Sequence, residues 1–441
     1  MATPDPADPL LRARLHPVDD EVKSPEPPWL ATLPHGEPGL SRVAALGQAA
    51  QAALRAGQAG QCLAALDEQR AAAGSDPPSL VWALTVSAVC RSTLGQLARS
   101  RADLAEARQN CMYAAPLLAQ PFWRFVEIVC NWLGGNWAAA SSDASTLYAD
   151  QVAPITPALT GVVLALRTEL LRGLGLPRES RMLAGRLPST TPAELSVWAR
   201  AGLDADDGRG ADALRDLADV YGARDRSMYR AALPLVLHRM ATIGFGRGDR
   251  QVTASAAAEL AELDQAAPLA EIMTGLGQAY ASGDPEPARR AQQLAEAEGA
   301  AMLIAEALIA RGQVGDDPAR TLAAAHATWD RIGAPGRVAE VAAIMRGAGL
   351  AAPAPAFAAA GVAAAGPAVL TARERSVAVL VHEGRTNQQI AHALNISVKT
   401  VEAYLTRLYR KTSCASRVEL AVAVTERRLI VTPKDAAGGP A

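Results

Sequence analysis

Residues 397–411 hold the side chains of this sequence best suited to contact a polyanion. If residues 398–412 form a helix, an apolar stripe of Val401, Leu405 and Leu408 lies on one side. The opposite side is short-chained near the helix start and basic near its end, with Lys399, Ala403, Thr406 and Arg410 flanked by Glu402 and Arg407. Short side chains let a backbone approach base edges, while Arg and Lys bind phosphates. The pattern favours a helix that lies in a DNA major groove over a merely solvated helix face.

Four capping signals indicate the elements that would position this helix. A Ser or Thr is followed three residues later by Glu or Gln at Thr371/Glu374, Thr386/Gln389 and Ser416/Glu419, and Ser397 is followed by Thr400. Only a few residues around Asn395 and Ile396 separate the second predicted helix from the third, and Asn tolerates the left-handed conformation of a tight turn. Two helices joined in this way form a helix-turn-helix.

Residues 370–424 resemble the DNA-binding domain of LuxR-type transcriptional regulators. The shared signature is Leu-Thr-x-Arg-Glu at 370–374, Asn-x-x-Ile-Ala-x-x-Leu at 387–394, Ile-Ser-x-x-Thr-Val at 396–401, Lys411 and Ser416-Arg417. The resemblance implies a four-helix domain that binds double-stranded DNA as a homodimer through its last helix, about 417–426. It also implies that bases are faced by Lys399, Glu402, Ala403 and Thr406, and the DNA backbone by Thr386, Asn387, Thr400, Arg407, Arg410 and Lys411. The sequence departs from the family at Glu402, Tyr404 and Thr412-Ser413, which leaves the operator sequence open.

The segment 319–350 resembles the helical region that precedes this domain in large ATP-binding LuxR-type regulators. Those proteins carry a phosphate-binding loop, but this sequence contains no Gly-x-x-x-x-Gly-Lys-Ser/Thr and no lysine between Lys23 and Lys399. We therefore expect no ATP-driven switch. Strands and helices do not alternate along the sequence, so we expect no receiver domain either.

The region from 41 to 350 repeats a helix, a glycine-containing turn and an alanine-rich helix. The turn glycines fall near residues 57, 95, 134, 173, 208, 246, 283 and 312, at spacings typical of helical hairpins. The region resembles tetratricopeptide-like repeats, which predicts an all-α fold, an α-solenoid followed by the four-helix domain. A solenoid offers a concave groove, and we expect a protein partner or small-molecule effector of unknown identity there. The tryptophans at 29, 82, 123, 132, 137, 198 and 329 are expected in the core between helices.

Composition and charge agree with this division. Only 4% of the 441 residues are aromatic, and the 50% hydrophobic content comes mainly from alanine, which favours helices. Residues 369–432 hold ten Arg and Lys against five Glu, a net charge of +5, whereas residues 1–368 carry −7. We expect a disordered Pro-rich segment at 1–40, a linker at 351–368 and a disordered tail at 433–441.

The remaining signals argue against catalysis and secretion. The motifs HExxH, GxSxG and CxxC are missing from the sequence, so we expect no enzyme activity, no cofactor and no metal site. The five cysteines, at 62, 90, 111, 130 and 414, suit a reduced compartment. We see no signal peptide and no apolar stretch long enough for a membrane span, and therefore expect a cytoplasmic protein.

Two functions remain after these exclusions. The first is a sequence-specific transcriptional regulator whose recognition helix is about 398–412 and whose helical repeats sense an effector. The alternative is an adaptor or scaffold in which the repeats do the work and the terminal domain binds protein.

Overall fold

The computed structural model describes residues 38–111, 116–149, 157–224, 229–353, 372–382, 385–394, 396–412 and 420. The fold is all-α, as the sequence predicts, and these residues include no β-strand. The chain divides after Pro355 into two compact units, which we call the repeat unit and the terminal unit. The predicted tail 433–441, most of the linker at 351–368 and residues 1–37 of the predicted N-terminal segment lie outside the described residues. Residues 38–40, the last three of that predicted segment, belong to the first described helix.

The repeat unit is a series of helical hairpins, each made of two sequential helices that pack against one another. The first four are α2 (Pro38–Arg55) with α3 (Ala59–Ala73), α4 (Pro77–Thr93) with α5 (Leu97–Asn110), α6 (Pro116–Gly134) with α7 (Trp137–Ala149), and α8 (Pro157–Gly173) with α9 (Pro177–Ala184). The next four are α10 (Ala193–Asp206) with α11 (Gly210–Gly222), α12 (Leu233–Gly246) with α13 (Arg250–Ala261), α14 (Pro268–Ser282) with α15 (Glu286–Glu298), and α16 (Ala301–Gln313) with α17 (Pro318–Ile332). The helix α18 (Pro335–Gly347) follows.

Local sequence sets the ends of these helices. Several begin with a proline in the first turn, where its missing N–H removes no helical hydrogen bond. Glycines in the left-handed conformation follow the first helix of each hairpin, at residues 57, 95, 135, 175, 208, 248, 283 and 315. Four of the predicted turn glycines therefore need correction: Gly134, Gly173, Gly246 and Gly312 are still helical, and the left-handed glycine comes one to three residues later.

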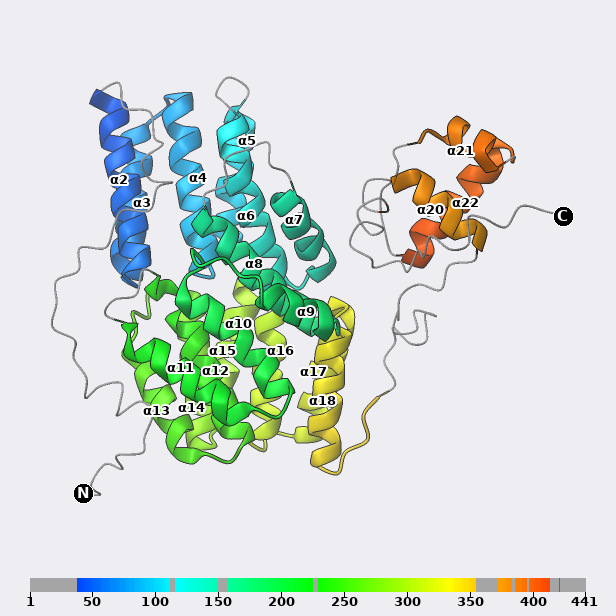
Figure 1. Cartoon of the computed structure of the whole chain (residues 1–441). Helices are drawn as coiled ribbons and strands as arrows, with labels where there is room; N and C mark the ends of the chain where they lie inside the picture. Colours follow the sequence, from blue (N-terminus) through cyan, green and yellow to red (C-terminus); the bar gives the residue numbers. More distant parts are fainter. Residues whose placement is uncertain are drawn as a thin grey trace, which may run out of the picture. The chain divides into compact units, whose positions relative to one another are not determined.

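The hairpins wind into a coil whose second turn lies against its first. Successive first helices (α4, α6, α8, α10, α12, α14 and α16) pack side by side, and in addition α16 contacts α6 and α18 contacts α8. Figure 1 shows α2–α6 standing in a row above the green and yellow helices of the second turn. The carboxyl end of a helix in the first turn of the coil lies against the start of a helix that comes five hairpins later in the chain. In this way α4 meets α14, α6 meets α16 and α8 meets α18.

One hydrophobic core extends from Val81 to Met345 through both turns of the coil. The rings of Trp137 and Trp329, which come from different turns, meet edge to face with centroids 5.2 Å apart. As predicted, Trp123, Trp132 and Trp198 are also buried, while Trp82 is half-buried. Trp29 lies outside the described residues. Because the core crosses between the turns, they stabilise one another.

Charged side chains are buried among the helices α8, α12, α16 and α18. Glu169 of α8 accepts hydrogen bonds from Arg172, at 2.7 Å, and from Arg239 of α12, at 2.9 Å. Burial alone would raise the pKa of Glu169, but the two guanidinium groups outweigh it and hold that pKa well below its ordinary value. A second group joins Arg337 of α18 to Glu306 and Glu340. Burial raises the pKa of Glu306 despite its partner Arg337.

His238 of α12 lies among these charges with its Nε2 atom buried and without a hydrogen-bond partner. Burial, together with the positive charges of Arg239 and Arg337, lowers its pKa to about 3. The imidazole is therefore neutral at ordinary pH.

No helix among the described residues has the length and apolar character needed to cross a bilayer. Cys62, Cys90 and Cys130 are buried and Cys111 is half-buried, and none of these four forms a disulfide. Cys414 lies outside the described residues.

Candidate nucleic-acid interface

Three helices of the terminal unit enclose a small apolar core. They are α20 (Ala372–His382), α21 (Asn387–Leu394) and α22 (Val398–Thr412). Their buried residues are Val377, Ala378, Val381, Ile390, Ala391, Val401, Leu405 and Leu408, together with Leu420. The predicted stripe of α22 is thus the side that packs, which leaves the opposite side facing outward.

Capping interactions fix where α21 and α22 begin. The amide of Thr386 donates to Gln389 Oε1 at 2.9 Å, and the amide of Gln389 donates to Thr386 Oγ1 at 3.3 Å, which completes a capping box. Ser397 Oγ accepts from the amide of Thr400 at 3.1 Å. These two predicted caps are confirmed, whereas Thr371 and Ser416 lie outside the described residues.

A short turn joins α21 to α22. The amide of Ile396 donates to the carbonyl oxygen of Ala391 at 3.0 Å, which brings the chain back over the end of α21. Arg373 of α20 donates to the carbonyl oxygen of Leu394 at 3.4 Å, next to the same turn. The arrangement is a helix-turn-helix, with α22 as its second helix.

The outward side of α22 carries most of the predicted contact residues. Lys399, Thr400, Glu402, Ala403 and Arg407 are exposed, and so is Thr386 before α21, while Asn387 is half-buried. The guanidinium of Arg407 lies 5.3 Å from the ring centroid of Tyr404, so it is held along the helix surface. Thr406, Arg410 and Lys411 fall within α22, but their side chains lie outside the described residues.

Two exposed residues beside this face were missed by the sequence reasoning. Arg385 immediately precedes the capping box and is exposed at the amino end of α21. Val398, at the first position of α22, keeps 38% of its surface exposed. The basic residue next to a helix start was visible in the sequence as an anion-binding signal. The exposure of an apolar valine was not visible, because it depends on which side of α22 packs.

This combination of caps, turn and exposed second helix defines a helix-turn-helix domain. Residues 368–424 match the bacterial regulatory proteins of the luxR family, and these residues therefore form a LuxR-family helix-turn-helix domain.

Similar sequences are found in curated proteins. A probable transcriptional regulator ycf29 of Cyanophora paradoxa is 50% identical over 60 residues, which cover 14% of this chain and 29% of that protein. The monoamine regulon transcriptional regulator of Klebsiella aerogenes is 44% identical over 54 residues, 12% of this chain and 24% of that protein. A putative HTH-type transcriptional regulator of Mycobacterium bovis is 49% identical over 51 residues, which cover 12% of this chain and 6% of that protein. The alignments span less than a third of each relative.

Proposed function

We propose that this protein is a sequence-specific DNA-binding transcriptional regulator. The observation that carries the proposal is the geometry of α22, whose Val401, Leu405 and Leu408 are buried while Lys399 and Ala403 face outward. The exposed side of such a helix has short side chains near its start, and in the sequence it has basic residues near its end. A DNA major groove is wide enough to admit an α-helix. The relatives named as transcriptional regulators match this same segment.

Within this proposal, the residues divide into two groups. Lys399, Glu402, Ala403 and Thr406 contact base edges; Lys399, Glu402 and Ala403 are exposed, and Thr406 follows Ala403 by three residues on the same helix. Thr386, Asn387, Thr400, Arg407, Arg410 and Lys411 contact the phosphate backbone, and we now add Arg385 to them. Dimerisation through residues 417–426 would place two copies of α22 on successive half-sites. The repeat unit would respond to an effector and govern the terminal unit.

Salt-dependent binding to duplex DNA tests the proposal. We expect the logarithm of the affinity to fall linearly with the logarithm of the salt concentration. The variants Arg410→Ala and Lys411→Ala each reduce that slope by about 0.9 if each side chain neutralises one phosphate. Arg250→Ala is the control, because Arg250 is exposed on α13 of the repeat unit. Fluorescence anisotropy with labelled duplexes gives the slopes, and a chain without duplex affinity at low salt would refute the proposal.

A second function is favoured by Glu402, an exposed carboxylate in the middle of the outward face. The negative charge of Glu402 would repel DNA phosphates. It would not hinder binding to a protein surface, which is what the terminal unit of an adaptor would do. Chromatin immunoprecipitation separates the two functions. Discrete promoter peaks support the regulator, whereas partner capture that survives nuclease treatment, without promoter occupancy, supports the adaptor.

A further inference from the structure

An apolar side chain is exposed at the start of the helix α22. Among the described residues, Val398 and Met182 are the large hydrophobic residues that remain exposed, and Val398 is the one that belongs to the terminal unit. By contrast, Val377, Val381 and Val401 are buried in the core of the same unit. The side chain of Val398 is therefore accessible to a binding partner.

The start of α22 does not require an apolar residue at position 398. Ser397 provides the cap, because its Oγ accepts from the amide of Thr400 at 3.1 Å. Ile396, which precedes the cap, packs against the core that includes Val401, and these are the two positions of a hydrophobic staple. Valine is also a weaker helix former than alanine or lysine. Neither the cap nor the core accounts for Val398.

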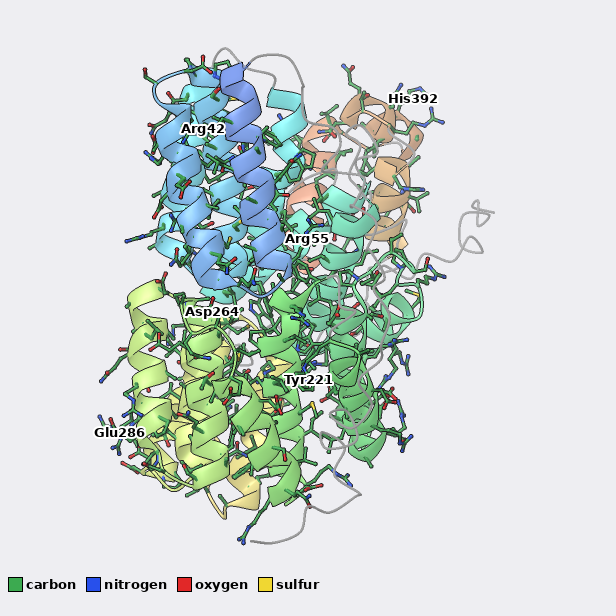
Figure 2. The ribbon with its side chains drawn as sticks, turned by 90° about the vertical axis from the view of Figure 1, so that its left-hand side faces the viewer. Arg42, Arg55, Tyr221, Asp264, Glu286 and His392 are labelled. Carbon is green, nitrogen blue, oxygen red and sulfur yellow. The ribbon has the colours of Figure 1, made fainter. Side chains whose placement is uncertain are left out.

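The position of Val398 gives its exposure a meaning that the exposure of Met182 lacks. Single exposed apolar residues are common on protein surfaces and need no partner. Val398, however, is the first residue of the second helix of a helix-turn-helix, and the amino-terminal residues of that helix contact base edges in such domains. The exposed side chains of Lys399 and Glu402 close to it are polar. The exposed side of α21 carries glutamines and His392, which Figure 2 shows on the outside of that helix.

Val398 shares one edge of α22 with Glu402. Residues four apart on an α-helix are neighbours on its surface, and both of these side chains are exposed. They are separated by about 6 Å along the helix axis. The bases of one DNA strand follow one another at about 3.4 Å. Two side chains on this edge of a helix in the groove therefore reach bases that are one or two base pairs apart.

The chemistry of valine selects one feature of the major groove. The C5-methyl group of thymine is the apolar group that base pairs present there, and apolar side chains contact it. The methyl groups of Val398 can pack against it, which removes apolar surface from water. Cytosine in the same place has no methyl group and presents its N4 amino group, which an apolar side chain would leave without a hydrogen-bond partner.

We propose that Val398 recognises a thymine through its C5-methyl group, one or two base pairs from the base that Glu402 faces. The inference rests on the proposed function, because it names a base of the DNA sequence that the regulator binds. Each half-site then contains a thymine within two base pairs of a cytosine whose N4 donates to Glu402. Val398 is thus a specificity-determining residue without a hydrogen-bonding side chain.

Replacement of thymine by uracil tests the inference, because uracil keeps the O4 acceptor and lacks only the methyl group. The preferred duplex is first selected from random sequences with the full chain, and each thymidine is then replaced in turn by deoxyuridine. We expect one position in each half-site to lose affinity about fourfold, which corresponds to about 0.8 kcal/mol for one methyl group. Equal affinities for thymine and uracil at every position would overturn the inference.

Val398→Ala should abolish the difference between thymine and uracil at that position. The residue is exposed and alanine favours a helix, so the variant keeps the core of the terminal unit. Anisotropy titrations of the two chains with the two duplexes form a double-mutant cycle. The control Met182→Ala removes the other exposed apolar side chain and should keep the full fourfold difference. A thymine preference that persists in Val398→Ala would assign the methyl contact to another residue and overturn the inference.

Two further results separate this inference from the proposed function. A full chain without duplex affinity at low salt contradicts the proposed function, whereas a chain that binds its selected duplex without any dependence on a thymine methyl group contradicts the inference alone. Selection repeated with Glu402→Gln locates the base that Glu402 faces. A separation of more than two base pairs between that base and the thymine would contradict the placement of both contacts on one edge of α22.

Discussion

The amide of Leu269 at the start of α14 donates a hydrogen bond of 3.1 Å to the carbonyl oxygen of Leu94 at the end of α4. The two residues come from different turns of the coil, so their bond ties the early hairpins to the late ones. It replaces the intrahelical partner that the amide of a residue in a first helical turn lacks. The close approach also requires Gly95, since a methyl group there would lie 2.9 Å from that same amide nitrogen.

Gly95→Ala should destabilise the repeat unit more than Gly283→Ala does. Both glycines have positive φ angles, of 85° and 74°, so each alanine costs about 1–2 kcal/mol of strain. Only Gly95 meets the other turn, because a methyl group on Gly283 has nothing within 4 Å. We expect an additional loss of about 1–3 kcal/mol for Gly95→Ala from overpacking. Chemical denaturation followed by tryptophan fluorescence gives the difference, and equal losses would show that the contact between turns contributes nothing.

Glu169→Gln should strongly destabilise the repeat unit. The substitution leaves the guanidinium groups of Arg172 and Arg239 buried without their shared anion, a change that costs about 3–5 kcal/mol. Asp212→Asn is the matched control, because the ion pair of Asp212 with Arg215 is exposed and contributes less than about 1 kcal/mol. Thermal and denaturant unfolding measure both variants. A loss for Glu169→Gln as small as that of the control would mean that this network does not stabilise the packing of α8 against α12.

His238 should make the repeat unit less stable as the pH falls. Its pKa is about 3 in the folded chain and about 6.5 in the unfolded chain, so between these values only the unfolded state binds the proton. The stability contribution is complete above about pH 6.5 and is lost progressively toward pH 3, by up to about 1.4 kcal/mol per pH unit. His238→Gln removes this dependence. Unfolding free energies of both chains from pH 7 to 4 provide the measurement, and parallel curves would contradict it.

Glu402→Gln should raise affinity for random duplex DNA and reduce discrimination for the preferred site. The carboxylate is exposed on the outward side of α22, where it repels phosphate but can accept a hydrogen bond from cytosine N4. Glutamine keeps an acceptor oxygen and removes the charge. The control Glu68→Gln alters an exposed carboxylate on α3. Anisotropy titrations with selected and scrambled duplexes give the ratio of affinities. An unchanged ratio would place Glu402 away from the bases.

The sequence by itself determined the helices and the class of the terminal domain. Capping pairs such as Thr386 with Gln389 act within three residues, and the stripe of Val401, Leu405 and Leu408 follows from helical periodicity, so both could be predicted without tertiary contacts. The repeat was visible because each hairpin needs its own glycine turn. The buried ion pairs of Glu169 and of Arg337, however, had no signal in the sequence.

Only the tertiary structure decided how the hairpins close on themselves. The pairing of Leu94 with Leu269, of Trp137 with Trp329 and of Arg172 with Gly336 depends on the curvature accumulated over five hairpins. Small differences in the angle between successive hairpins add up along a coil, and no local feature of the sequence predicts the total.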